Sequence, residues 1–144
     1  MPSYFAYGSN MSSAQMTRRV QSAVARGRGR LPDFRFCCNK LGRDGSAKGN
    51  VEVARGETVW GVVYDMDQES IDQLDRFEKG YRRVALEVIQ DDGSRVVCQV
   101  YVSEQITQAA RPLSQYRQRM AEGAAEHNLP PAVVDALRTL EVQD

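Results

Sequence analysis

The chain has 144 residues, of which 42% are hydrophobic and 26% are charged. This fits one globular domain over residues 1–144 that can bury a real core. Nineteen basic and nineteen acidic residues cancel, so no net field favours nucleic acid or an anionic membrane, and we expect neither partner. The N-terminal residues lack the basic and apolar regions of a signal peptide, and no run approaches the ~20 apolar residues of a membrane span.

The N-terminal segment predicts a strand that turns into a helix. Residues 4–7 are rich in aromatic side chains, which favour strands. Gly8-Ser9-Asn10 then turns the chain. Ser12 and Gln15 have the spacing of a capping box, so we expect a helix from this point to about Arg19.

The middle of the chain predicts strands separated by glycine-containing segments. Residues 26–30 (Arg-Gly-Arg-Gly-Arg) are expected to form a linker, whereas the alternation in 31–39 predicts a strand. Three glycines in 41–50 indicate a loop. Residues 51–66 should form two strands around a turn at Arg55-Gly56-Glu57, and the second strand, apolar on both faces, should be central.

The remaining elements are a helix, a hairpin and two further helices. The first helix, capped by Asp67 or Ser70, should run to about Glu78 and end at Gly80. A hairpin over 81–102 should turn at Asp91-Asp92-Gly93. Apolar stripes predict helices over about 113–126 and after Pro130-Pro131.

The order of these elements predicts the fold class. Helices are inserted between strands without strict alternation of strand and helix, which favours an α+β fold. We expect a mixed, mostly antiparallel sheet that curls into a small barrel flanked by several helices.

Cysteine and histidine are too few and too scattered to suggest a metal site or a disulfide framework. Cys37 and Cys38 are adjacent, Cys98 stands alone, and His127 is the single histidine. Zinc sites need clustered thiolate and imidazole ligands, and the sequence has no C-x-x-C pair. We therefore expect no metal and a cytoplasmic, reducing environment.

Glu78 occupies an unusual position for a carboxylate. On a helical wheel of about 100° per residue it falls between Ile71 and Leu74, inside the apolar stripe. Burial and the negative end of the helix dipole both disfavour a charged carboxylate, so we predict a raised pKa, which suits a general acid or base. The alternative is a side chain that points to water or pairs with Arg82 or Arg83.

The turn at residues 7–10 is a second candidate site. Gly8 lets a ligand approach the backbone, and free N–H groups at a helix start can bind a carboxylate. The same residues would also serve as a plain connector. Ser9 is a poor candidate for a hydrolase nucleophile because Tyr7 and Met11 replace the glycines of a G-x-S-x-G elbow. Tyr101 lies on a face that we expect to pack in the core.

Taken together, these segments resemble the γ-glutamylcyclotransferase family. The likeness rests on the motifs YFAYGSNM at 4–11, RLPDFRF at 30–36, VWGVVYDM at 59–66, LDRFE at 74–78 and HNLPP at 127–131. Members of this family convert a γ-glutamyl compound into 5-oxoproline and release the attached amine or amino acid. The resemblance implies that no cofactor is used.

The resemblance also implies a role for individual residues. Glu78 matches the catalytic glutamate of the family. Tyr116 matches a tyrosine that contacts the substrate, and Tyr81 is expected to line the same cavity. Lys79 departs from the pattern, because many relatives place glycine directly after the glutamate. The substrate-binding loop of the family corresponds to Tyr4, Phe5, Ala6, Tyr7, Gly8, Ser9 and Asn10.

Several questions stay open at this point. The resemblance implies a small γ-glutamyl substrate, which could be a γ-glutamyl amino acid, a γ-glutamylamine or an isopeptide. A non-catalytic module that binds small acidic ligands in the same cavity, and a protein-interaction domain, are the alternatives. The oligomeric state is open, with a homodimer as one alternative. We expect the leaving group to lie against 41–50 and 103–116.

Overall fold

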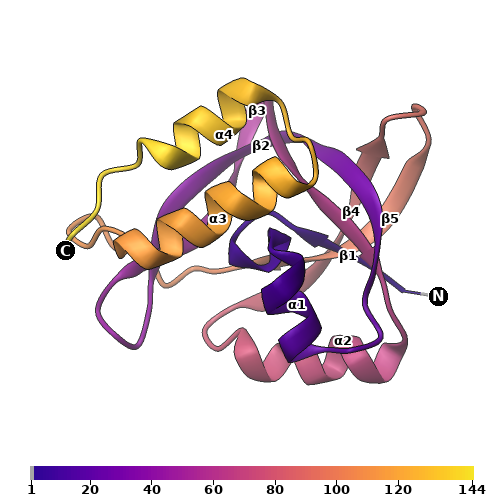
Figure 1. Cartoon of the computed structure of the whole chain (residues 1–144), viewed down its shortest axis with the longest axis horizontal. Helices are drawn as coiled ribbons and strands as arrows, with labels where there is room; N and C mark the ends of the chain where they lie inside the picture. Colours follow the sequence, from indigo (N-terminus) through magenta and orange to yellow (C-terminus); the bar gives the residue numbers. More distant parts are fainter. Residues whose placement is uncertain (1) are drawn as a thin grey trace.

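The strands of this computed structural model, which describes residues 2–144, close into a barrel with the order β1-β3-β2-β4-β5 (Figure 1). Neighbouring strands are antiparallel except β1 and β5, which are parallel where Tyr4 pairs with Gln99. The predicted α+β class with a mixed, mostly antiparallel barrel is therefore confirmed. The strands are β1 (Ser3–Ala6), β2 (Val24–Leu41), β3 (Ala47–Asp65), β4 (Arg82–Gln90) and β5 (Arg95–Val102).

The expected linker at 26–30 is wrong, because these residues belong to the long strand β2. Gly29 pairs with Gly61 of β3 on one side and with Gln90 of β4 on the other. A Cβ atom on Gly29 would lie 2.7 Å from a methyl group of Val88. Glycine therefore permits close strand packing where the barrel closes, instead of breaking the chain into a linker.

The expected turn at Arg55-Gly56-Glu57 lies inside one continuous strand, β3. The register of β2 with β3 jumps between Pro32 and Phe34, so the extra residues form a bulge. Gly56, with a φ of 84°, donates its N–H to Asp33 Oδ1 at 2.9 Å. The loop predicted over 41–50 is also shorter than expected, because β3 begins at Ala47.

Four α-helices flank the barrel within residues 2–144 (Figure 1). Ser12 caps the first of them by accepting the Gln15 N–H, as predicted. None of the helices described is long and apolar enough to cross a membrane. The helices are α1 (Ser13–Arg19), α2 (Gln68–Leu74), α3 (Ser114–Glu126) and α4 (Pro131–Arg138), and single 3₁₀ turns η1 (Ser9–Met11) and η2 (Asp75–Phe77) precede α1 and follow α2.

Close packing of α3 fixes the position of the N-terminal turn. Met120 and Ala124 of α3 are fully buried in a core shared with Met11 and Met16. A Cβ atom on Gly123 would lie 2.5 Å from the Ser12 backbone nitrogen, so only glycine allows this approach. The turn at 8–12 is therefore held between the barrel and α3.

Candidate active site

A cavity of about 460 Å³ opens where η1, α3, the β2–β3 connection and the segment after η2 meet. This volume suits a small molecule. Of the ten residues predicted for the site, eight line the cavity together: Tyr4, Tyr7, Gly8, Ser9, Asn10, Glu78, Tyr81 and Tyr116.

Phe5 and Ala6 differ from their neighbours, because both are fully buried and neither lines the cavity. Successive side chains of a strand point to opposite faces. Phe5 therefore fills the barrel core beside Val63 and Val88, and Ala6 packs on the face that the helices cover.

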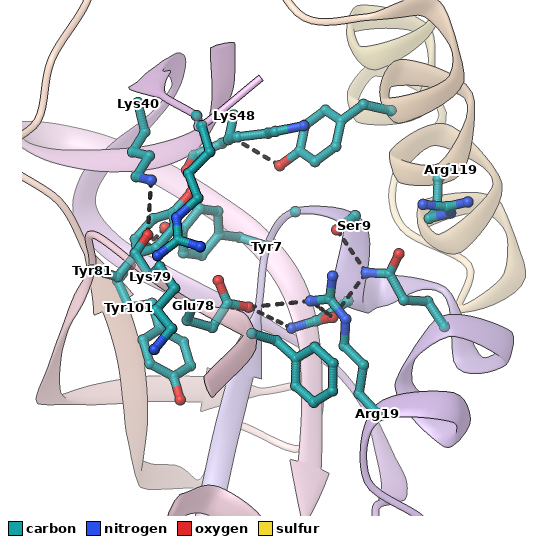
Figure 2. A pocket seen from close by; sticks show the side chains of 18 of the residues that line it. Tyr7, Ser9, Arg19, Lys40, Lys48, Glu78, Lys79, Tyr81, Tyr101 and Arg119 are labelled. Carbon is teal, nitrogen blue, oxygen red and sulfur yellow. Dashed lines mark hydrogen bonds and ion pairs between the residues drawn. The ribbon is translucent and has the colours of Figure 1, made fainter. Parts of the chain in front are cut away.

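Glu78 lies just after η2, so the predicted helix was one turn too long. Its carboxylate Oε1 accepts a hydrogen bond from Asn10 Nδ2 at 2.8 Å and lies 3.6 Å from Arg19 Nη1, whereas Oε2 has no dashed contact in the close-up (Figure 2). The alternative that Glu78 pairs with Arg82 or Arg83 is wrong, because Arg82 pairs with Glu104 and Arg83 pairs with two aspartates. One oxygen is thus held and the other faces the cavity.

The predicted rise in the pKa of Glu78 is confirmed. Only 13% of its side chain is exposed, and this burial raises the pKa to about 7. The positive charges of Arg19 and Lys40 and the hydrogen bond from Asn10 oppose the shift without cancelling it. The carboxyl can therefore both accept and return a proton near neutral pH.

A network behind Asn10 fixes the direction of its amide. Gln15 Nε2 donates to Asn10 Oδ1 at 2.9 Å and to Ser9 Oγ at 2.7 Å. Arg19 Nη1 donates to the same Asn10 oxygen at 3.0 Å. Because both donors use the oxygen side, the NH₂ group of Asn10 must face Glu78 and Tyr4.

The sequence analysis missed Gln15 and Arg19 as parts of the site. Their spacing of four residues places both on one face of α1. The spacing could have indicated that both side chains face the same region. Gln15 was instead assigned to a capping box, which accounts for the residue without a site.

Tyrosines form one wall of the cavity and are held by backbone groups. Tyr81 donates its hydroxyl to the Gly49 carbonyl at 2.6 Å, and Tyr116 accepts the Gly49 N–H at 2.8 Å. Tyr101, which we expected in the core, also lines the cavity and donates to Asp75. Burial raises the pKa of all three phenols, so they stay protonated at neutral pH.

The backbone turn at 8–10 carries donors that its own hydrogen bonds leave free. The first bond of the turn runs from the Met11 N–H to the Gly8 carbonyl, so it does not use the N–H groups of Ser9 and Asn10. A Cβ atom on Gly8 would lie 3.2 Å from the Tyr116 hydroxyl. Glycine thus keeps this edge of the cavity open, and the free N–H groups favour an anion.

Cationic side chains surround the cavity, although the whole chain has no net charge. Their gathering could not be read from the sequence, because they come from β2, β3, α1, α3 and the segments between. Within residues 2–144, no group of three or more His, Cys, Asp and Glu side chains is placed to hold a metal ion. The cations are Arg19, Lys40, Arg43, Lys48, Arg76, Lys79 and Arg119, against Asp44 and Glu78 as the acids.

Comparisons with known proteins agree with this geometry. The model of the AIG2-like family matches residues 58–137. A protein of Mus musculus named gamma-glutamylcyclotransferase is 31% identical over 96% of this chain and 78% of its own length. The Homo sapiens protein of the same name is 30% identical over 98% of this chain and 79% of its own length.

Solved structures show the same relationship. A structure named gamma-glutamyl cyclotransferase superposes with a TM-score of 0.91 at 27% identity, covering 99% of this chain and 89% of that chain. An AIG2-like protein of Mus musculus is more distant, with a TM-score of 0.56 at 26% identity over 75% of this chain and 80% of its own. The chain therefore belongs to the AIG2-like, γ-glutamylcyclotransferase family.

Proposed function

We propose that this chain is a γ-glutamylcyclotransferase, which converts a γ-glutamyl compound into 5-oxoproline and a free amino acid or amine, with Glu78 as general acid and base. One observation carries the proposal. A buried carboxyl with a pKa of about 7 faces a cavity sized for a small molecule. The names of the relatives supply the reaction class.

The reaction begins with the α-amine of the substrate, which arrives as an ammonium ion because a free α-amine has a pKa of about 8. Glu78 accepts one proton from this ammonium. The freed nitrogen attacks the γ-carbonyl carbon of the same molecule and forms the new C–N bond of a five-membered lactam. Glu78 gives its proton to the departing nitrogen, and the C–N bond to the leaving group breaks. Glu78 then accepts the second proton from the ring nitrogen, which leaves a neutral lactam, and passes it to the released amine, which departs as an ammonium ion.

The proton balance uses Glu78 twice and consumes no other reagent. Oε1 stays bound to Asn10 and Arg19, so Oε2 is the atom that we assign to proton transfer. A placed acid or base contributes about 10²- to 10⁴-fold in rate. Because nucleophile and electrophile share one molecule, the reaction already avoids the entropy cost of a bimolecular encounter, and the cavity adds to the rate by holding the chain in its folded, reactive conformation.

Holding the substrate is the role that we assign to the turn and the tyrosines. The N–H groups of Ser9 and Asn10 bind the α-carboxylate in this proposal, since they are free donors at a cavity edge. Tyr4, Tyr7, Tyr81 and Tyr116 shape the wall against which the γ-glutamyl chain bends. Gly8 admits the ligand beside the Tyr116 hydroxyl.

The test is a product assay across γ-glutamyl substrates. Wild-type protein and the variant Glu78→Gln are incubated with γ-glutamyl-alanine, γ-glutamyl-ethylamide and γ-glutamyl-ε-lysine, and 5-oxoproline is quantified. We expect product with wild type and a loss of at least about 100-fold with Glu78→Gln. Glu57→Gln is the matched control, because Glu57 is exposed and outside the cavity.

The assay also separates the alternatives. Turnover of γ-glutamyl-ε-lysine alone would move the assignment to an amine or isopeptide cyclotransferase. A γ-glutamyl compound that raises the melting temperature without forming 5-oxoproline would indicate a binding module instead. Near-normal turnover by Glu78→Gln would remove Glu78 from the mechanism.

A further inference from the structure

The charge of the cavity exceeds what the proposed reaction uses. Each of its two acids already has a cationic partner: Glu78 pairs with Arg19, and Asp44 pairs with Lys48 at 3.4 Å. Asp44 is also tied into its own loop by the N–H and hydroxyl of Ser46. Within residues 2–144, Lys40 and Arg43 have no carboxylate partner, although both line the cavity.

The burial of Lys40 is the strongest single observation in favour of an anion in this part of the cavity. Lys40 is 5% exposed, which is rare for a lysine without a carboxylate partner. Its ammonium donates to the Lys79 carbonyl at 2.8 Å and lies 5.0 Å from the centre of the Tyr81 ring. A carbonyl and an aromatic face stabilise a buried cation less than an opposite charge does, so an anion entering the cavity would complete this environment.

Two further cations gather on the same side. Lys48 lies over the Tyr116 ring, 4.8 Å from its centre, and Arg43, which also lines the cavity, belongs to the β2–β3 connection. Burial lowers the pKa of Lys40, and the charges of Lys48 and Arg43 lower it further, whereas the charge of Glu78 opposes them without cancelling the shift. Figure 2 shows Lys40 and Lys48 on one side of Glu78, whereas Arg119 stands apart from them on α3.

We propose that Lys40, Arg43 and Lys48 form a subsite for an acidic leaving group, so that the cavity favours γ-glutamyl compounds whose released amino acid carries a second carboxylate. This inference rests on the proposed function. In this proposal the backbone turn at 8–10 serves the γ-glutamyl part, on the side of Tyr116 where Gly8 lies. An ordinary leaving amino acid brings one carboxylate, whereas the subsite offers three cations and one paired acid.

A matched pair of substrates isolates the second carboxylate. γ-Glutamyl-glutamate and γ-glutamyl-glutamine have the same shape and the same leaving nitrogen, and they differ in one charge. We expect the ratio of their kcat/KM values to be about 10 or more in favour of the acid at low ionic strength. The ratio should fall with added salt, because partly exposed charges are screened.

Variants of the three cations then test whether they cause the preference for the acidic dipeptide. Arg43→Gln combined with Lys48→Gln should bring the ratio below about 3, because it lowers kcat/KM for γ-glutamyl-glutamate more than kcat/KM for γ-glutamyl-glutamine. Arg55→Gln is the control, since Arg55 is an exposed cation outside the cavity. Lys40→Met should lower the ratio too, and melting curves show whether that buried variant remains folded.

Calorimetry of γ-glutamyl-glutamate and γ-glutamyl-glutamine binding to Glu78→Gln separates the subsite proposal from the proposed function. Turnover with a wild-type ratio of about one, or a ratio that survives in the double variant, overturns the subsite and leaves the proposed function intact. Tighter binding of the acidic dipeptide without any 5-oxoproline from wild type supports the subsite and overturns the function. Equal binding and no turnover overturn both.

Discussion

Replacing Arg19 by methionine should move the pH dependence of turnover upward. The guanidinium lies 3.6 Å from Glu78 Oε1 and stabilises the charged carboxylate. Coulomb's law at an effective dielectric constant of about 20 gives an upper bound of about 4–5 kcal/mol for this pair. A quarter of the Arg19 side chain is exposed, so solvent screening reduces the effect, and we expect a rise of about one to two pKa units.

The sign follows from the role of Glu78 as a base. Turnover requires the ionised carboxylate, so kcat/KM rises as pH passes its pKa, which is about 7 in the wild type. Without Arg19 this rising limb should move up by about one to two pH units, which lowers kcat/KM at pH 7 by about 5- to 50-fold, and the deficit relative to wild type should shrink as pH rises. The substitution also removes the guanidinium from its place over the Phe77 ring, 5.0 Å from the ring centre.

The assay is 5-oxoproline release as a function of pH for wild type, Arg19→Met, Arg19→Lys and Arg18→Met. Arg18 is exposed and outside the cavity, so its variant should behave as wild type. Arg19→Lys keeps the charge and should lie between the extremes. A rising limb that stays in place, or moves to lower pH, in Arg19→Met would refute the electrostatic reasoning.

Three further predictions concern stability. The folded pKa of Glu78 is raised above its unfolded value of about 4.3, so ionising it destabilises the fold as pH rises. The free energy of unfolding of Glu78→Gln relative to wild type should therefore grow between about pH 4.5 and 7, by up to ~3 kcal/mol, and level off above pH 7. Urea unfolding at several pH values measures this difference, and the absence of such a trend would contradict the burial argument. Gly123→Ala should destabilise by about 3 kcal/mol, although alanine normally favours helices, because its Cβ would meet the Ser12 backbone; an unchanged urea midpoint would argue against this packing. Tyr116→Phe removes the acceptor of the Gly49 N–H and should cost about 1–3 kcal/mol in the same experiment, whereas no loss would mean that water replaces the hydroxyl.

Local patterns predicted the elements whose causes are local. The hairpin of β4 and β5 turns at 91–94 as expected, and the helices capped by Ser12 and Asp67 begin where their caps place them. The prediction failed at two glycines, because glycine is found in turns, in bulges and where two strands approach closely. Gly29 allows a close approach to β4, and Gly56 belongs to a bulge, and both depend on the partner strand.

The sequence indicated only those parts of the candidate site that a single residue and its local pattern can reveal. Glu78 was visible because a carboxylate fell in an apolar stripe, and the structure places it in a buried position. Its partner Arg19 was not visible, because α1 and the end of η2 meet through tertiary packing across a separation of 59 residues between positions 19 and 78. The cations of the cavity were hidden for the same reason, since a zero net charge says nothing about their distribution.

The most direct test of the account is the titration of the Glu78 carboxyl itself. Carbon-13 NMR of protein labelled at glutamate carboxyls, with Glu78→Gln to assign the resonance, measures this pKa in the folded chain. The account predicts about 7, matching the rising limb of kcat/KM for 5-oxoproline release. A titration near the ordinary glutamate value of about 4.3, with the kinetic limb elsewhere, would contradict the assignment of Glu78 as the proton-transfer group.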